Sequence, residues 1–69
     1  MPLTMARMGE ENYIKKVGGK AETRKFLESL GFVTGSAVTV VAAIGGNVIV
    51  NVKESRVAVS REMAAYIMV

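Results

Sequence analysis

The chain has 69 residues, and this length predicts one small domain over residues 1–69. Because 51% of the residues are hydrophobic and 22% are charged, the chain is too apolar for a disordered tail. It contains neither cysteine nor histidine, and all its acidic residues are glutamate, which excludes disulfides, zinc knuckles, thiolate nucleophiles and imidazole bases. The net charge of +3 is compatible with an anionic partner, but neither half of the chain forms a basic tail.

Residues 32–52 carry no charge and have the length of a membrane span, since a helix needs roughly 20 residues to cross a bilayer. Gly45-Gly46 interrupts this run, and its apolar residues are mostly valine, which favours strands. The run therefore predicts a buried β-hairpin. Residues 1–9 lack the apolar core of a signal peptide, and a small domain without cysteine is typical of the reducing cytosol, so we expect a cytoplasmic protein.

The first predicted elements are a short strand and a helix. Tyr13–Val17 has the character of a strand and ends at Gly18-Gly19. Along Ala21–Leu30, apolar side chains recur at the spacing of one helix face, at Phe26, Leu27 and Leu30. Gly31 follows this helix and can adopt the left-handed conformation of a C-terminal cap. Phe32 would then pack back on Leu27.

A hairpin and a third strand follow the helix. Apolar residues alternate over 38–43 and again over 48–53, and Gly45-Gly46 supplies the tight turn between them. A short connection at Glu54-Ser55 leads into Arg56–Val59, where Val57 and Val59 share one face. Three consecutive antiparallel strands are therefore expected.

The chain ends with a helical turn and a closing strand. Ser60 is placed to cap a short helix through Ala64, with Glu62 in its first turn, and Tyr66–Val69 returns as a strand. Five short strands in so small a chain cannot bury both faces of a flat sheet. The predicted fold class is mainly β: a small, strongly bent five-stranded barrel with an inserted helix that plugs one end, and a short C-terminal helical turn.

No arrangement of residues predicts catalysis. The glycines match no phosphate-binding spacing, and the serines have no histidine partner. The composition still allows a catalytic serine–lysine pair, but no motif points to one. A metal site would have to use glutamates, and the neighbouring pair Glu10-Glu11 would point to opposite sides of a strand. We expect no enzyme activity, no catalytic residue, no cofactor and no metal site.

The densest group of cations predicts a protein-binding surface. Five of the nine basic residues lie close together in sequence, at Lys15, Lys16, Lys20, Arg24 and Lys25. Nucleic-acid binding by small barrels uses exposed aromatic rings among such cations, but Phe26 and Phe32 are assigned to the helix and its cap, so no nucleic acid is expected. The candidate partner-binding residues are those of the basic helix, Lys20, Arg24, Lys25, Leu27 and Leu30. The alternative is that one or both leucines belong to the core.

The order of these motifs resembles the FeoA family. The residues that carry the resemblance are Leu27–Phe32, Gly35, Val38–Val40, Gly46, Val50–Val52, Ser55–Val59, Ala64 and Ile67–Val69. The likeness extends from Leu3 and Gly9 to the last residue. One departure is Val59, where the family more often has leucine.

The resemblance implies a Src-homology-3-like barrel with an inserted helix. It also implies a non-enzymatic accessory protein of bacterial ferrous iron transport, which docks on the cytoplasmic, GTP-hydrolysing part of the membrane transporter FeoB and reaches the membrane only through that partner. Without cysteine or histidine the chain is a poor iron carrier, so the transporter would handle the metal. Strand edges left by a partly open barrel would allow a homo-oligomer.

A second resemblance implies a different function. The same small barrel resembles the C-terminal domain of metal-dependent transcriptional repressors of the diphtheria-toxin-repressor type, which would make the chain a regulator module or a small nucleic-acid-binding barrel. A strongly salt-dependent shift of oligonucleotides would favour it.

Overall fold

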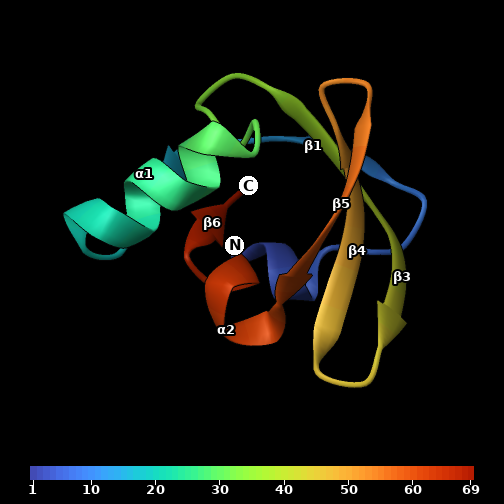
Figure 1. The fold of residues 1–69 in the computed structure, drawn as a ribbon. Helices are drawn as coiled ribbons and strands as arrows, with labels where there is room; N and C mark the ends of the chain where they lie inside the picture. Colours follow the sequence, from blue (N-terminus) through green and yellow to red (C-terminus); the bar gives the residue numbers. More distant parts are fainter.

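The computed structural model describes residues 1–69, which form two antiparallel sheets and two α-helices (Figure 1). The elements in chain order are the 3-10 helix η1 (Leu3–Met5), β1 (Glu11–Tyr13), β2 (Lys16–Val17), α1 (Ala21–Ser29), β3 (Ala37–Ile44), β4 (Asn47–Val52), β5 (Ser55–Ser60), α2 (Arg61–Ala64) and β6 (Ile67–Met68). One sheet has the order β1-β3-β4-β5, and the other pairs β2 with β6. The mainly β fold class predicted from the sequence is confirmed.

The meander β3-β4-β5 is the largest part of the structure and follows the predicted alternation closely. Val38 pairs with Val52 and Val40 with Val50, so these side chains share the buried face of the sheet. Gly45 has a φ of 59°, which the first position of a tight hairpin turn requires. No helix of the structure is long and apolar enough to cross a membrane, and the uncharged run 32–52 supplies β3 and β4 instead.

The alternation breaks at one place in β3. The register shifts between Val40 and Ala42, so that Val41 is an extra residue in this strand and Ala42 pairs with Ile49. A bulge of this kind moves the following side chains to the other face of the sheet. Strict period-2 alternation, as expected from the sequence, therefore holds only on the N-terminal side of Val41.

The predicted strand Tyr13–Val17 is divided between the two sheets. Its first residue, Tyr13, pairs with Ala37 in β3, whereas Lys16 pairs with Met68 in β6. Ile14 lies between the two pieces, 2% exposed, and its backbone bonds to the loop before β3: its N–H donates to Ser36 and its carbonyl accepts from Gly35. The chain thus changes sheets at Ile14, whose side chain belongs to the core cluster.

The helix α1 ends in the predicted Schellman motif. The N–H of Phe32 donates to the Leu27 carbonyl over 3.1 Å, and the N–H of Gly31 donates to the Glu28 carbonyl over 3.0 Å. Gly31 has a φ of 108°, which a residue with a Cβ rarely adopts. Leu27 and Phe32 are both fully buried, so this cap joins the end of the helix to the core.

The C-terminal segment closes the structure as expected. The Ser60 hydroxyl accepts a hydrogen bond from the Met63 N–H over 3.2 Å, which caps α2. Strand β6 then pairs with β2, and the backbones of Met1 and Val69 bond to each other in both directions. The two termini therefore lie side by side, as Figure 1 shows.

The core is one apolar cluster with no buried polar side chain. Its members are Leu3, Ile14, Leu27, Phe32, Val38, Val40, Val48, Val50, Val52, Val59, Ala64, Ile67 and Val69. Leu3 belongs to η1, an element not predicted from the sequence. Because the larger sheet ends at β1 and β5, those two strands keep one unpaired edge each.

Candidate partner-binding surface

The basic residues predicted to meet a partner belong to α1 and the segment before it, and Figure 1 shows α1 on the opposite side of the molecule from the label of β3. Lys20 is the N-cap residue of α1, and Arg24 and Lys25 follow within the helix. All three are exposed, and so are Lys15 and Lys16 of the adjoining segment. The five predicted cations are therefore available to a partner.

The two leucines predicted beside them do not share this surface. Leu27 is fully buried and joins the core, so the prediction that it contacts a partner is wrong for this conformation. Leu30 is half-buried and packs against the core cluster. The alternative weighed from the sequence, that at least one leucine is a core residue, is confirmed for Leu27.

An aromatic side chain takes the place of Leu27 on the exposed helix face. Phe26, assigned to the apolar face by its spacing, is 51% exposed. Successive helical residues are turned by about 100°, so Leu27 pointing into the core directs Phe26 sideways and Lys25 outward. The helix buries one fully enclosed side chain rather than a broad stripe.

Tyr66 extends this surface from another element. A Cβ atom on Gly19 would lie 3.3 Å from both the Tyr66 ring and the Thr23 methyl group, so the ring lies beside Gly19, near the start of α1. Tyr66 is 44% exposed. We call Lys20, Arg24, Lys25, Phe26 and Tyr66 the α1 surface.

Acidic residues moderate the charge of the α1 surface. Glu22 and Glu28 are exposed on the same helix, and Glu28 follows Arg24 by one turn. The cations of Lys20, Arg24 and Lys25 thus exceed these carboxylates by one charge, and Lys15 and Lys16 add two more nearby. This balance favours a mildly acidic, partly apolar partner surface over a polyanion.

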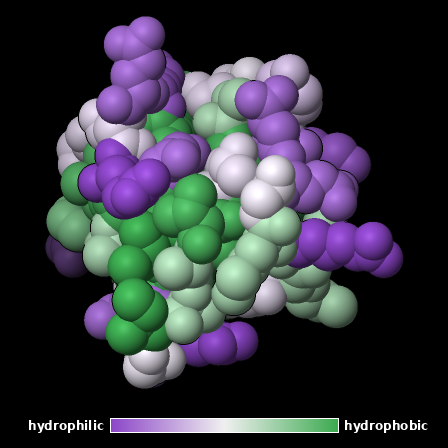
Figure 2. Space-filling view, turned by 90° about the vertical axis from the view of Figure 1, so that its right-hand side faces the viewer, coloured by the Kyte–Doolittle hydropathy of each residue, from purple (hydrophilic) through white to green (hydrophobic).

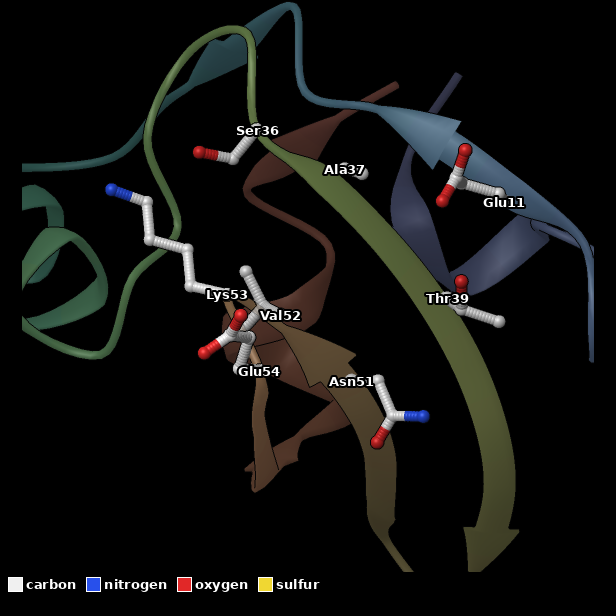
Figure 3. A pocket seen from close by; sticks show the side chains of 8 residues that line it. All are labelled: Glu11, Ser36, Ala37, Thr39, Asn51, Val52, Lys53 and Glu54. Carbon is white, nitrogen blue, oxygen red and sulfur yellow. The ribbon is translucent and has the colours of Figure 1, made fainter.

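A shallow polar groove lies on the outer face of the larger sheet (Figure 3). It has a volume of about 360 Å³ and is lined mostly by polar and charged side chains, from β1, the start of β3, the end of β4 and the turn after β4. Glu11 lies at one side, and Lys53 and Glu54 lie at the other. The two carboxylates are thus separated across the groove, and no group of three side chains able to hold a metal ion occurs in the chain.

Glu11 is instead engaged with a tyrosine on its own strand. The Tyr13 hydroxyl donates to the Glu11 carboxylate over 3.1 Å. This hydrogen bond and the negative charge of Glu11 raise the pKa of Tyr13 above its usual value. The pair stabilises a protonated phenol, which is a poor general base near neutral pH.

The other half of the same sheet face is apolar. The aligned positions Ala42, Ile49 and Ala58 form a row across three strands, and Ile44 lies beyond them, 63% exposed. Figure 2 shows hydrophobic side chains gathered on this side of the molecule, with hydrophilic side chains around them. The row ends at β5, the edge strand of the sheet.

The similarity of this chain to known proteins extends over its whole length. The family model described as the FeoA domain matches residues 1–69. The chain is 37% identical over 68 residues to the protein named "Putative Fe(2+) transport protein A" of Methanocaldococcus jannaschii, an alignment that covers 99% of this chain and 83% of that protein.

Solved structures share the fold of this chain. A crystal structure of an iron uptake regulatory protein, FeoA, superimposes with a TM-score of 0.90 at 23% identity, covering 99% of this chain and 92% of the other. The zinc complex of Stenotrophomonas maltophilia FeoA, named as an SH3 domain protein, gives 0.85 at 24% identity, with 99% and 87% covered.

A manganese-dependent transcriptional repressor gives a TM-score of 0.87 at 18% identity over 97% of this chain and 39% of its own, which is a likeness of fold alone. The SH3-like architecture expected from the sequence is confirmed. With a family model that spans every residue and an iron-transport relative of 37% identity, the chain belongs to the FeoA family.

Proposed function

We propose that this chain is a non-enzymatic accessory protein of ferrous iron transport, which docks in the cytoplasm on the GTP-hydrolysing part of a FeoB-type membrane transporter. Membership of the FeoA family over the whole length carries the link to iron transport. The docking step is supported by the α1 surface, which combines exposed cations with two exposed aromatic rings.

The composition of the α1 surface suits a protein partner. Aromatic side chains supply contact area with little loss of conformational freedom, and cations at the rim orient an acidic partner before contact. Phe26 and Tyr66 would provide the contact area, while Arg24 and Lys25 would provide the orientation. Leu30, half-buried at the end of the helix, would support Phe26 from below.

The test is the affinity of the purified chain for the cytoplasmic part of the FeoB protein of the same organism. We expect the double reversal Arg24→Glu/Lys25→Glu to weaken binding at least about tenfold, since close charge pairs contribute one to several kcal/mol. Phe26→Ser should weaken it comparably by removing the aromatic contact. Iron-dependent growth of cells that carry these variants should fall in parallel.

The matched control is Arg7→Glu/Arg61→Glu, which makes the same change of net charge at exposed residues outside α1. It should leave affinity within about twofold once salt screens long-range attraction. Equal weakening by both double variants would mean that net charge alone governs binding, and an unchanged affinity of the α1 variants would remove the α1 surface from the proposal.

A regulator or nucleic-acid role is the competing function, because the fold is shared with a manganese-dependent repressor and because Phe26 is exposed. The same protein samples should be tested with single- and double-stranded oligonucleotides over a range of salt concentration. Micromolar binding with a steep salt dependence, lost in Phe26→Ser, would favour that role over transporter docking.

A further inference from the structure

The strand β5 has a free edge whose backbone groups are unpaired. β5 is the last strand of its sheet and pairs only with β4. Antiparallel partners alternate between residues that exchange hydrogen bonds and residues whose backbone groups point to the outside. The N–H of Arg61 donates to the Gly46 carbonyl over 3.0 Å, which fixes this alternation along the ladder.

Every second residue before Arg61 directs its backbone N–H and carbonyl groups toward β4, which includes Val59 and Val57. Ala58 and Arg56, which lie between them, direct these groups away from β4. Outside the ladder with β4, no backbone hydrogen bond reaches Arg56 or Ala58. Both residues are exposed. The edge therefore offers two donors and two acceptors at the spacing of a pairing strand.

This edge has few of the features that usually prevent pairing, and Arg56 is its one charged residue. Exposed edges are normally shortened, bulged, or protected by lysine, proline or an inward charge. β5 is six residues long, keeps one register with β4, and contains neither lysine nor proline. The opposite edge of the sheet, β1, is only three residues long. Of the two edges, β5 is the one suited to accept a strand.

The side chains beside the edge specify what can pair with it. Arg56 and Ala58 lie on the outer face, where Ala58 ends the apolar row that starts at Ala42. The Arg56 Nε donates to Asn51 Oδ1 over 3.2 Å, which orients the guanidinium and leaves its terminal nitrogens available for a carboxylate. An added strand would meet a hydrophobic position beside Ala58 and a cation beside Arg56.

We propose that the β5 edge binds an extended segment of a partner protein by antiparallel strand addition, and that this segment has the pattern apolar, apolar, acidic. The first residue would lie beside Ala58, the second beside the half-buried Val57 on the inner face, and the acidic residue beside Arg56. This surface is separate from the α1 surface and does not depend on it.

Charge disfavours a second copy of the chain as the occupant. If two β5 strands paired about Val57, each Arg56 would lie diagonally across from the other, in a molecule that already carries a net charge of +3. An acidic segment instead neutralises Arg56. The favoured occupant is therefore a different protein.

The experiment uses the whole chain and a capped peptide of about eight residues, with Val-Val-Glu at its centre and threonines on both sides. In the free protein, the amides of Arg56 and Ala58 should exchange with solvent quickly, whereas those of Val57 and Val59 exchange slowly. Saturating peptide should slow exchange at Arg56 and Ala58 by at least about tenfold, because each amide gains a strand hydrogen bond.

Matched controls separate strand addition from general attraction. Two control peptides should not slow amide exchange at Arg56 and Ala58. One has lysine in place of the glutamate, and the other is N-methylated on the two residues that would bond to Arg56 and Ala58. The variant Arg56→Glu should reverse the preference between the glutamate and lysine peptides, while Arg61→Glu, a matched charge change outside β5, should not. Each variant's fold is checked by its amide spectrum.

Three outcomes would overturn the proposal. The first is unchanged exchange of Arg56 and Ala58 at millimolar peptide. The second is protection of these amides in the protein alone together with a dimeric mass, which would assign the edge to a second copy. The third is an Arg56→Glu variant with the same preference as the parent protein. Loss of binding to FeoB by α1 variants would bear only on the function proposed above, so the two proposals fail separately.

Discussion

Phe32 donates its backbone N–H to the carbonyl oxygen of Leu27 over 3.1 Å, and the side chains of both residues are fully buried. The last turn of α1 is thus tied to the core by this hydrogen bond and by two side chains that both belong to the core cluster. The short helix has few other buried side chains, so this pair holds the α1 surface in its orientation.

Leu27→Ala should lower the free energy of unfolding by about 2–5 kcal/mol, the cost of a cavity at a fully enclosed leucine. Phe26→Ala, the neighbouring change at a half-exposed side chain, should cost less than about 1 kcal/mol. Urea unfolding followed by circular dichroism measures both. Equal costs would mean that Phe26 is packed against the core and does not belong to the α1 surface.

Gly31→Ala should destabilise the protein by about 1–2 kcal/mol, because its φ of 108° is unfavourable for any residue with a Cβ. The new methyl group would find ordinary contact distances of 3.7 Å to Lys53 and Val52, so the cost comes from the backbone and not from a clash. Gly46→Ala is the control: its φ is not positive and nothing lies within 4 Å. A smaller loss in Gly31→Ala than in Gly46→Ala would contradict the cap geometry.

The turn between β4 and β5 stores backbone strain. Lys53 and Glu54 have φ values of 46° and 63°, a conformation that a two-residue hairpin turn favours for asparagine followed by glycine. The double change Lys53→Asn/Glu54→Gly should raise the free energy of unfolding by about 1–2 kcal/mol. Glu54→Gln, which removes only the charge, should change it by less than about 0.5 kcal/mol. Thermal unfolding that ranks the double variant below the parent would argue against this turn.

The Glu11–Tyr13 pair predicts a pH dependence at the alkaline end. The hydrogen bond and the charge of Glu11 raise the pKa of Tyr13, so the folded protein holds the phenolic proton more tightly than the unfolded chain does. The resulting stabilisation is fully present below the unfolded pKa of about 10 and is lost as the pH rises through the higher folded pKa.

This pKa can be measured by ultraviolet titration in a Tyr66→Phe background, where Tyr13 is the only tyrosine. Glu11→Gln should lower the pKa of Tyr13 toward its usual value, whereas Glu10→Gln, with the same charge change one residue away, should leave most of the shift in place. A larger effect of Glu10→Gln would show that the hydrogen bond of 3.1 Å is not the cause.

The sequence by itself determined the features that depend on residues close together in the chain. The alternation of Val48, Val50 and Val52, the left-handed Gly31 and the cap at Ser60 each follow from relations within a few residues, and each is present in the structure. The exposed cations of the α1 surface were predictable for a second reason, because lysine and arginine are rarely buried without a partner.

Only the tertiary structure decided which of the apolar residues the fold covers. Phe26 and Leu27 fit the same helical pattern, yet one is half exposed and the other enclosed, because only the face of α1 toward the sheets has a neighbour. The change of sheets at Ile14 and the free edge of β5 likewise depend on which distant segments lie beside them. Burial and strand pairing depend on segments far apart in sequence, so local periodicity limits the choices and long-range packing selects among them.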